Sequence, residues 1–160
     1  MSKKTPEENI ICRNRKASFH FHTLEIVECG IVLQGTEVKS LRSHAASLDE
    51  SYARIDDNEL WLIKAYIAPY RFGHERNHNP QRPRKLLVHA REVRRLRPKV
   101  EQRGLTLVPL RMYFSNRGLA KVTLALARGK PRRDKRQDLK ARDHQREMDR
   151  ALRRSRRVSR

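Results

Sequence analysis

The chain has 160 residues, of which 37% are hydrophobic, which is enough for one domain with a small core and a tail. Its 38 Lys and Arg residues outnumber its 18 Asp and Glu residues, and the net charge of +20 disfavours compaction unless a polyanion binds. No apolar run approaches the roughly 18 residues of a membrane span, and the start MSKKTPEENIIC lacks a signal-peptide core. Cys12 and Cys29 give no disulfide framework. We therefore expect a cytoplasmic protein that binds RNA or DNA and no membrane.

The first part of the chain is predicted to be mainly extended. We expect residues 1–13 to form a flexible N-terminus. Residues 21–29 and 30–35 have the pattern of strands, and residues 37–42 fit a short helix.

A hairpin is predicted next, because residues 51–55 and 59–67 flank the turn sequence Asp56-Asp57-Asn58. In its second arm Leu60, Leu62 and Tyr66 lie on one face. The opposite face holds Trp61, Ile63, Ala65 and Ile67, so both faces are expected to be covered.

A helix is predicted over residues 90–103, with Gly104 as its stop. Its apolar residues at helical spacing are Val93, Leu96 and Val100. Because Pro98 removes a backbone donor, we expect a kink or two short pieces.

A second hairpin is predicted where residues 105–114 and 120–127 flank Asn116-Arg117-Gly118. Short strands with one or two helices predict a mainly β fold with helices, built as a small closed antiparallel β-barrel. Closure of the barrel would remove exposed sheet edges.

The chain after residue 128 differs from the rest. Residues 129–160 hold 3 Lys and 11 Arg against 4 Asp and 1 Glu, a net charge of +9, with few large apolar residues. We therefore predict a folded body over residues 14–128 and a basic tail over residues 129–160, disordered when free.

Metal binding and catalysis have weak signals. His74 and His78 are four residues apart and His20 and His22 are two apart, but no Cys-x-x-Cys motif accompanies them. No serine has a nucleophile elbow, and no glycine-rich phosphate loop is present. We expect no metal, no cofactor and no enzymatic activity.

RNA binding has stronger signals, because basic side chains are interleaved with rings. Near the first strands the basic residues are Arg13, Arg15, Lys16, Lys39 and Arg42. A later loop combines Arg76, Arg82, Arg84 and Lys85 with Phe72, His74 and His78. The alternative, that aromatic residues simply pack the barrel, is preferred for Tyr52, Trp61, Tyr113 and Phe114.

Several segments then combine into a recognisable series. They are NRKA (14–17), GIVLQGTEVKSLR (30–42), SYARI (51–55), PRKLLVH (83–89), GLTLVPLRMYF (104–114), DKR (134–136) and DLKARD (138–143). In sequence and in order they resemble the SsrA-binding protein family, also called small protein B, and the resemblance covers residues 14–152.

The resemblance implies a barrel of the oligonucleotide-binding type with flanking helices. It implies binding to the tRNA-like domain of transfer-messenger RNA and delivery of that RNA to stalled ribosomes for trans-translation. The tail would enter the decoding centre and the message channel and become helical there, and the free protein is expected to be a monomer. The alternative is a general ribosomal RNA-binding protein or RNA chaperone, with an RNA-processing enzyme as a distant third.

The family's motifs also imply individual contacts. The RNA-binding residues are expected to be Asn14, Arg15, Lys16, Glu28, Lys39, Arg42, Arg84, Lys85, Leu87 and Lys121. For Leu87, core packing is the alternative. The ribosome-binding tail residues are expected to be Gly129, Arg133, Asp134, Lys135 and Arg136. Arg133 stands where the family often has His or Tyr, and its guanidinium plane could stack instead.

Overall fold

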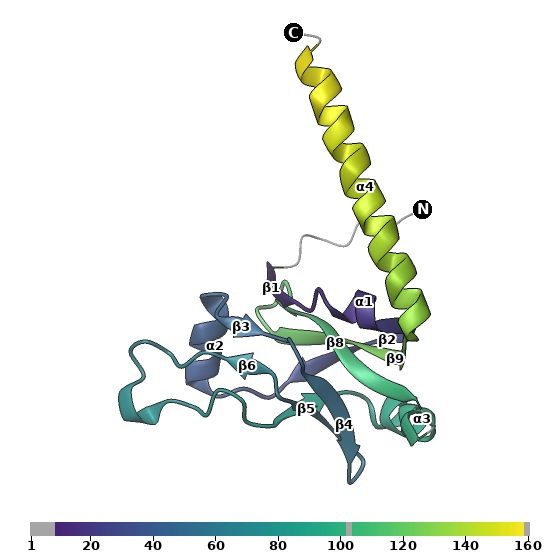
Figure 1. Cartoon of the computed structure of the whole chain (residues 1–160). Coiled ribbons are helices and arrows are strands. Elements are labelled where there is room, and N and C mark those ends of the chain that lie inside the picture. The colour runs from purple at the N-terminus through teal and green to yellow at the C-terminus, as the bar shows by residue number, and fades with distance from the viewer. Residues whose placement is uncertain (1–8, 102–103, 159–160) are drawn as a thin grey trace.

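The computed structural model describes residues 9–101 and 104–158. Its strands are β1 (Asn9–Arg13), β2 (Phe21–Ile31), β3 (Ala46–Ser47), β4 (Tyr52–Asp56), β5 (Glu59–Ile63), β6 (Tyr66–Ile67), β7 (Arg84–Leu87), β8 (Leu105–Phe114) and β9 (Ala120–Gly129). Its helices are α1 (Ala17–His20), α2 (Gly35–Arg42), α3 (Ala90–Glu101) and α4 (Arg132–Val158), with a 3-10 turn η1 (His74–Arg76). The expected mainly β architecture with helices is confirmed (Figure 1).

The larger sheet closes on itself. Its described strands pair in the order β1-β8-β4-β5-β7-β2-β9, and β9 pairs back onto β8, so the strands from β8 to β9 form an antiparallel ring. The core side chains inside the ring that are at most 1% exposed include Leu60, Leu62, Met112, Val122 and Leu124. Each such burial contributes roughly 1.5–3 kcal/mol, which makes the ring interior the main source of stability.

Strand β2 and helix α2 differ from their expected bounds. The strand expected over residues 30–35 ends at Ile31, because α2 already begins at Gly35. A capping box sets this start: the backbone N–H of Gln34 donates to Glu37 Oε2 at 2.6 Å, and the Gln34 side chain accepts from the Glu37 backbone. The helix therefore starts earlier than the sequence pattern indicated.

Both predicted hairpins are present. Asp57 and Asn58 have φ values of 44° and 61°, which is the geometry that a two-residue hairpin turn requires. Gly118 has a φ of 74° in the turn between β8 and β9, a conformation that glycine adopts without strain. Turn chemistry therefore identified both connections correctly.

The second arm of the first hairpin is interrupted at Lys64. Alternation from Leu60 onward predicted that Tyr66 shares its face and that Ala65 and Ile67 lie opposite. Lys64 adopts a left-handed φ of 59° and separates β5 from β6. As a result Ala65 and Ile67 are fully buried in the core, whereas Tyr66 is 40% exposed. The prediction for this arm was wrong after residue 63.

Helix α3 is continuous through Pro98, where we expected a kink or two short pieces. Proline costs a hydrogen bond to the carbonyl four residues earlier, here Arg94. Both Pro98 and Arg94 lie on the exposed side of the helix, where water can satisfy that carbonyl. The opposite side buries Val93 and Leu96, which hold the helix on the ring.

The elements that were not predicted are β1, α1, β7 and the short β3 and η1. Residues 9–13, assigned to a flexible N-terminus, instead form β1 along β8 and bury Ile11, while residues 1–8 lie outside the described residues. Helix α1 is a single turn that begins where Asn14 Oδ1 accepts from the Ala17 backbone at 3.1 Å. Strand β7 fits between β5 and β2 and completes the ring.

Helix α4 extends away from the body (Figure 1). It is attached at its start, where the Lys130 backbone N–H donates to His20 O at 2.8 Å and His22 lies 3.3 Å from Asp134. Farther along α4, the described side chains from Leu139 onward are exposed. Within the described part of the chain, α4 and the other helices lack the long apolar stretch needed to cross a membrane.

Candidate nucleic-acid interface

Three strands meet on the outer face of the ring at Gly30. Gly30 of β2 pairs with Leu87 of β7 on one side and with Lys121 of β9 on the other. Paired residues of antiparallel strands point to the same face, and Glu28 shares it because side chains alternate along a strand. A Cβ on Gly30 would lie 3.3 Å from the Leu87 Cβ, so glycine allows this close approach. The register thus brings together three residues that the family resemblance singled out.

Glu28 is held in one orientation from two sides. The Tyr113 hydroxyl donates to Glu28 Oε1 at 2.5 Å, and Lys121 Nζ lies 3.5 Å from Oε2. The Tyr113 hydrogen bond is the main reason why the pKa of Glu28 lies below its usual range, and Lys121 adds to the effect. The Glu28 side chain remains 48% exposed, so an ionised, oriented acceptor faces solvent.

Sequence reasoning missed the support beneath Glu28. Tyr113 is 2% exposed but pairs with Lys121 of β9, so it lies on the outer face of the ring and not among the interior side chains, which corrects the expected packing. The Arg111 guanidinium lies 5.0 Å from the Tyr113 ring centre and donates to Thr123 Oγ1 at 3.1 Å. The alternation of Arg111, Met112 and Tyr113 along β8 was the one available signal.

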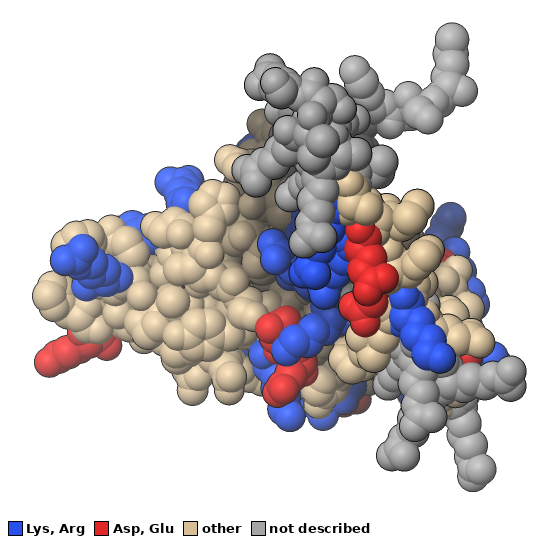
Figure 2. Space-filling model, turned by 45° about the horizontal axis from the view of Figure 1, so that its top comes forward, with Lys and Arg blue, Asp and Glu red and all other residues tan. Residues whose placement is uncertain are grey.

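Exposed apolar side chains border this charged group. Leu87 is 52% exposed, so the core-packing alternative for it was wrong, and its contact with RNA stays a prediction. Ile26, on the same face of β2 as Glu28, is 60% exposed. We name the surface formed by Ile26, Glu28, Leu87 and Lys121 the β2 face. In the view of Figure 2, basic and acidic side chains lie side by side across the middle of the molecule.

The basic stretch before α1 divides into structural and exposed residues. Asn14 is used internally, because its Nδ2 donates to Leu48 O at 3.3 Å and its Oδ1 accepts from the Ala17 backbone N–H at 3.1 Å. Arg15 and Lys16 are exposed, and Lys16 lies 3.7 Å from Asp49. Beside them is a half-open cavity of about 610 Å³ whose lining includes Phe21, Tyr52 and Val108.

Helix α2 and strand β7 carry the next predicted residues. Lys39 and Arg42 are exposed on α2, and the Lys39 ammonium lies 5.1 Å from the Tyr70 ring centre. Lys85 is ion-paired with Glu59 across β7 and β5 and is partly exposed. These three cations remain accessible to a polyanion.

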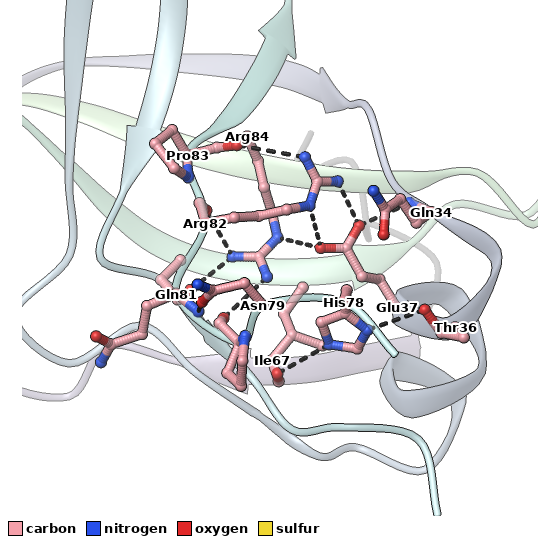
Figure 3. Close-up of polar contacts among 12 residues, drawn as sticks. Gln34, Thr36, Glu37, Ile67, His78, Asn79, Gln81, Arg82, Pro83 and Arg84 are labelled. Carbon is pink, nitrogen blue, oxygen red and sulfur yellow. Dashed lines mark hydrogen bonds and ion pairs between the residues drawn. The ribbon is translucent and has the colours of Figure 1, made fainter. Parts of the chain in front are cut away.

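Arg84 is the exception among the predicted RNA-binding residues, because it is fully buried (Figure 3). Its guanidinium donates to Glu37 Oε1 at 2.8 Å and to the backbone carbonyls of Ala65 and Pro80 at 2.6 and 2.9 Å. Arg82 donates to both Glu37 oxygens. The buried guanidinium is used inside the protein, which corrects the expected RNA contact of Arg84.

The predicted tail residues begin at the end of β9. Gly129 is exposed and ends that strand, and Asp134 in the first turn of α4 lies beside His22. The side chains of Arg133, Lys135 and Arg136 lie outside the described part of the structure. Their contact with the ribosome stays a prediction.

The histidines weighed as metal ligands have different environments. His78 is buried between Thr36 Oγ1 at 3.0 Å and Ile67 O at 3.1 Å, which explains its burial by hydrogen bonding. His74 is exposed in η1. The residues that the structure describes contain no group of three or more His, Cys, Asp or Glu side chains arranged to hold a metal ion.

Comparison with known proteins gives one consistent result. The family model described as "SmpB protein" matches residues 11–154. The SsrA-binding proteins of Brucella canis and Brucella ovis are each 52% identical to the chain over 151 residues, which is 94% of this chain and 96% of each relative. A solved structure described as "tmRNA-SmpB: a journey to the center of the bacterial ribosome" is 52% identical, with a TM-score of 0.66, over 80% of this chain and 93% of the other.

Proposed function

This chain belongs to the SmpB protein family, and we propose that it binds the tRNA-like domain of transfer-messenger RNA and delivers that RNA to stalled ribosomes for trans-translation. The observation that carries the proposal is the pairing of Gly30 with both Leu87 and Lys121. That register assembles the β2 face, and similar proteins bear the name SsrA-binding protein.

The chemistry of the β2 face suits a structured RNA. Lys121 supplies a cation for a phosphate, which positions the RNA without reading its sequence. Glu28 is an oriented acceptor for a ribose hydroxyl or a base amino group, and Leu87 and Ile26 offer apolar area to an unstacked base. A carboxylate among cations disfavours indiscriminate phosphate binding, so the mixture supports selection of one RNA shape.

The rest of the body serves as the scaffold in this proposal. We propose that the ring of strands is a closed barrel of the oligonucleotide-binding type formed by residues 14–128, which acts in the cytoplasm as a monomer when free. The binding role is non-enzymatic and requires no cofactor or metal. Support comes from the pairing of β9 back onto β8 and from the single continuous core inside the ring.

The tail has a separate role in the proposal. Residues 129–160 would contact the decoding centre and message channel through Gly129, Arg133, Asp134, Lys135 and Arg136, and gain stable helical order there. Support comes from the high charge of the segment and from the exposure of its described side chains from Leu139 onward. Binding to RNA phosphates would neutralise the repulsion among its arginines.

Two substitutions test the β2 face. Glu28→Ala and Lys121→Ala should each weaken binding to a tRNA-like-domain transcript, and Lys121→Ala should lower the slope of log affinity against log salt by about one. Glu101→Ala and Lys64→Ala are charge-matched controls outside that face, and both should bind as the wild type does. Wild-type affinity in both test variants would contradict the assignment of this surface.

The identity of the RNA is tested by sequencing what co-purifies with the full-length protein. One dominant transfer-messenger RNA is the expected result. A broad mixture of RNAs would contradict the proposal and favour a general RNA-binding protein or RNA chaperone. Turnover of a labelled RNA by the purified protein would instead indicate a processing enzyme.

A further inference from the structure

The loop between β6 and β7 exposes an aromatic and basic surface that the proposed function does not use. We name the aromatic loop the segment from Tyr70 to Arg76. Its Phe72 side chain is 66% exposed, the highest exposed fraction among the large hydrophobic side chains that the structure describes. The loop forms the lobe at the left of Figures 1 and 2, away from α4, and carries basic side chains near its tip.

Side-chain hydrogen bonds fix the shape of the aromatic loop. Asn77 closes it, because its Oδ1 accepts from the Tyr70 backbone N–H at 2.8 Å and its Nδ2 donates to Tyr70 O at 2.9 Å. The Gly73 N–H donates to the same carbonyl at 2.9 Å. A Cβ on Gly73 would lie 2.7 Å from the Asn77 amide, so only glycine fits against this closure. The backbone on either side of Phe72 is therefore held in place by these contacts.

The end of the loop is anchored in the interior. His78 is buried between Thr36 of α2 and the Ile67 carbonyl of β6 (Figure 3). Arg82 then reaches Glu37 at 2.6 and 2.8 Å. Both contacts connect the loop to α2, which carries Lys39 and follows directly after β2. The aromatic loop is thus attached to the helix that follows β2 in the chain.

Cations lie against both rings of the loop. The Lys39 ammonium is 5.1 Å from the Tyr70 ring centre, and the Arg71 guanidinium is 5.7 Å from that of Phe72. The two rings contact each other edge-on with centres 5.6 Å apart. Glu75 is the single acidic residue of the loop. Rings that alternate with cations on an exposed surface match the requirements of an unpaired nucleotide, a base to stack and a phosphate to neutralise.

We infer that the aromatic loop and Lys39 form a second RNA-contact surface, which stacks an unpaired base of the bound RNA on Phe72 and holds its phosphates with Arg71 and Lys39. The inference rests on the proposed function for the identity of that RNA. Closing the loop does not require the Phe72 side chain, because the hydrogen bonds of Asn77 and Gly73 that close it are made to the Tyr70 backbone. Its ring buries little area within the protein and is available to a partner.

The test is a titration of a tRNA-like-domain transcript with full-length variants. Phe72→Ala and Phe72→Leu should weaken binding by roughly five- to a hundredfold, because both lose the stacking face. Phe72→Trp should bind as the wild type does, since it keeps an aromatic face. Unchanged thermal unfolding of all three variants is expected, because the side chain is largely exposed.

A charge-matched pair separates the loop from general electrostatics. Arg71→Ala and Arg54→Ala each remove one exposed cation, and Arg54 pairs with Asp56 at 2.9 Å outside the loop. Arg71→Ala should weaken binding and lower the salt slope by about one, whereas Arg54→Ala should do neither. Equal effects of the two substitutions would overturn the inferred phosphate contact.

The loop and the proposed function can fail separately. If Lys121→Ala weakens binding but the Phe72 variants all match the wild type, the second surface is wrong and the proposed function stands. If the wild type does not prefer the transcript to an unstructured RNA of equal length, the proposed function is wrong. In that case, the relative affinities of the Phe72 variants for the unstructured RNA decide whether the loop binds RNA at all.

Discussion

Glu28 has an unusual position for a residue proposed to bind a polyanion. Its carboxylate would repel phosphates, but Lys121 lies 3.5 Å from one oxygen and compensates the charge. The other oxygen is fixed by the Tyr113 hydroxyl at 2.5 Å. The group is thereby an acceptor of defined direction, which can distinguish ribose and base donors from phosphates. Tyr113 acts in this arrangement as a positioning residue.

Tyr113→Phe should raise the pKa of Glu28 toward its ordinary value, because the hydroxyl is the main cause of the depression. A larger fraction of Glu28 is then protonated near pH 5, so RNA affinity should fall more at pH 5 than at pH 7 relative to the wild type. An NMR titration of the Glu28 carboxyl carbon and binding curves at both pH values measure the two effects.

Tyr66→Phe is the matched control, since it removes a hydroxyl from an exposed tyrosine on β6. It should leave both the Glu28 titration and the binding curves unchanged. An unaltered Glu28 pKa in Tyr113→Phe would show that Tyr113 does not position the Glu28 carboxylate.

At the scale of elements, a buried carboxylate joins α2 to β7. Glu37 is fully buried, and its carboxylate accepts hydrogen bonds from the Arg84 and Arg82 guanidinium groups. Its Oε2 also accepts from the Gln34 backbone N–H at the start of α2. Burial is the largest single influence on the pKa of Glu37 and raises it, but the bonds from Arg82, Gln34 and Arg84 together lower it. Burial also disfavours the charged form of Arg84, so it lowers the pKa of that guanidinium, and Glu37 opposes this effect. The interaction is stable only while both partners stay charged.

Glu37→Gln should destabilise the fold by about 3–5 kcal/mol at pH 7, because it leaves the buried Arg84 guanidinium without a counter-charge. Glu59→Gln removes a partner of Lys85 at the surface and should cost less than about 1 kcal/mol. Urea unfolding monitored by circular dichroism gives both free energies. A loss from Glu37→Gln no larger than that from Glu59→Gln would contradict the structural role.

The pH dependence has a defined sign. Since the folded-state pKa of Glu37 is lowered, the stability from its ionised form is fully present above the ordinary carboxyl pKa of about 4.3 and is lost as the pH falls below it. The difference in unfolding free energy between the wild type and Glu37→Gln should therefore narrow in acid. A gap that widens below pH 4 would reverse the assigned pKa direction.

Local signals predicted the local parts of this fold. Turn sequences located the hairpins around Asn58 and Gly118, and apolar spacing located α3. Lys64 was missed because nothing in its residue type favours a left-handed φ. Strand β7 was missed because its four residues include Arg84, whose burial depends on Glu37, 47 positions earlier. Pairing partners distant in sequence leave no periodic signal.

The same limit applies to the candidate site. Glu28, Leu87 and Lys121 came from resemblance to a family, and composition alone would not have connected them. Their proximity depends on Gly30 pairing with two strands at once, which is a property of the closed ring. Tyr113 was predicted to pack the barrel, and its place beside Glu28 on the outer face follows only from its pairing with Lys121.

At the scale of the molecule, the residues that the structure describes join the body and α4 mainly at the start of the helix. The Lys130 ammonium donates to Ser18 O at 2.9 Å and its backbone N–H to His20 O, and Asp134 lies beside His22. From Leu139 onward, the side chains of α4 that the structure describes are exposed and provide little packing, and a helix without packing is marginal in water. A segment of this kind can act on a different partner from the body, as we propose for the ribosome.

Truncation after Lys130 should therefore separate the two roles. The truncated protein keeps the β2 face, the aromatic loop and the Lys130 contacts. Its affinity for the tRNA-like-domain transcript should therefore lie within about tenfold of that of the full chain at 0.15 M salt. At this salt concentration, attraction between the tail and the RNA is screened beyond about 8 Å. In reconstituted translation of a message without a stop codon, it should append no tag, because no segment reaches the decoding centre. Full-length Lys121→Ala is the complementary control, since it should lose affinity for the transcript while retaining the tail. Tagging by the truncated protein at the wild-type level would contradict this division, because the body alone would then suffice on the ribosome.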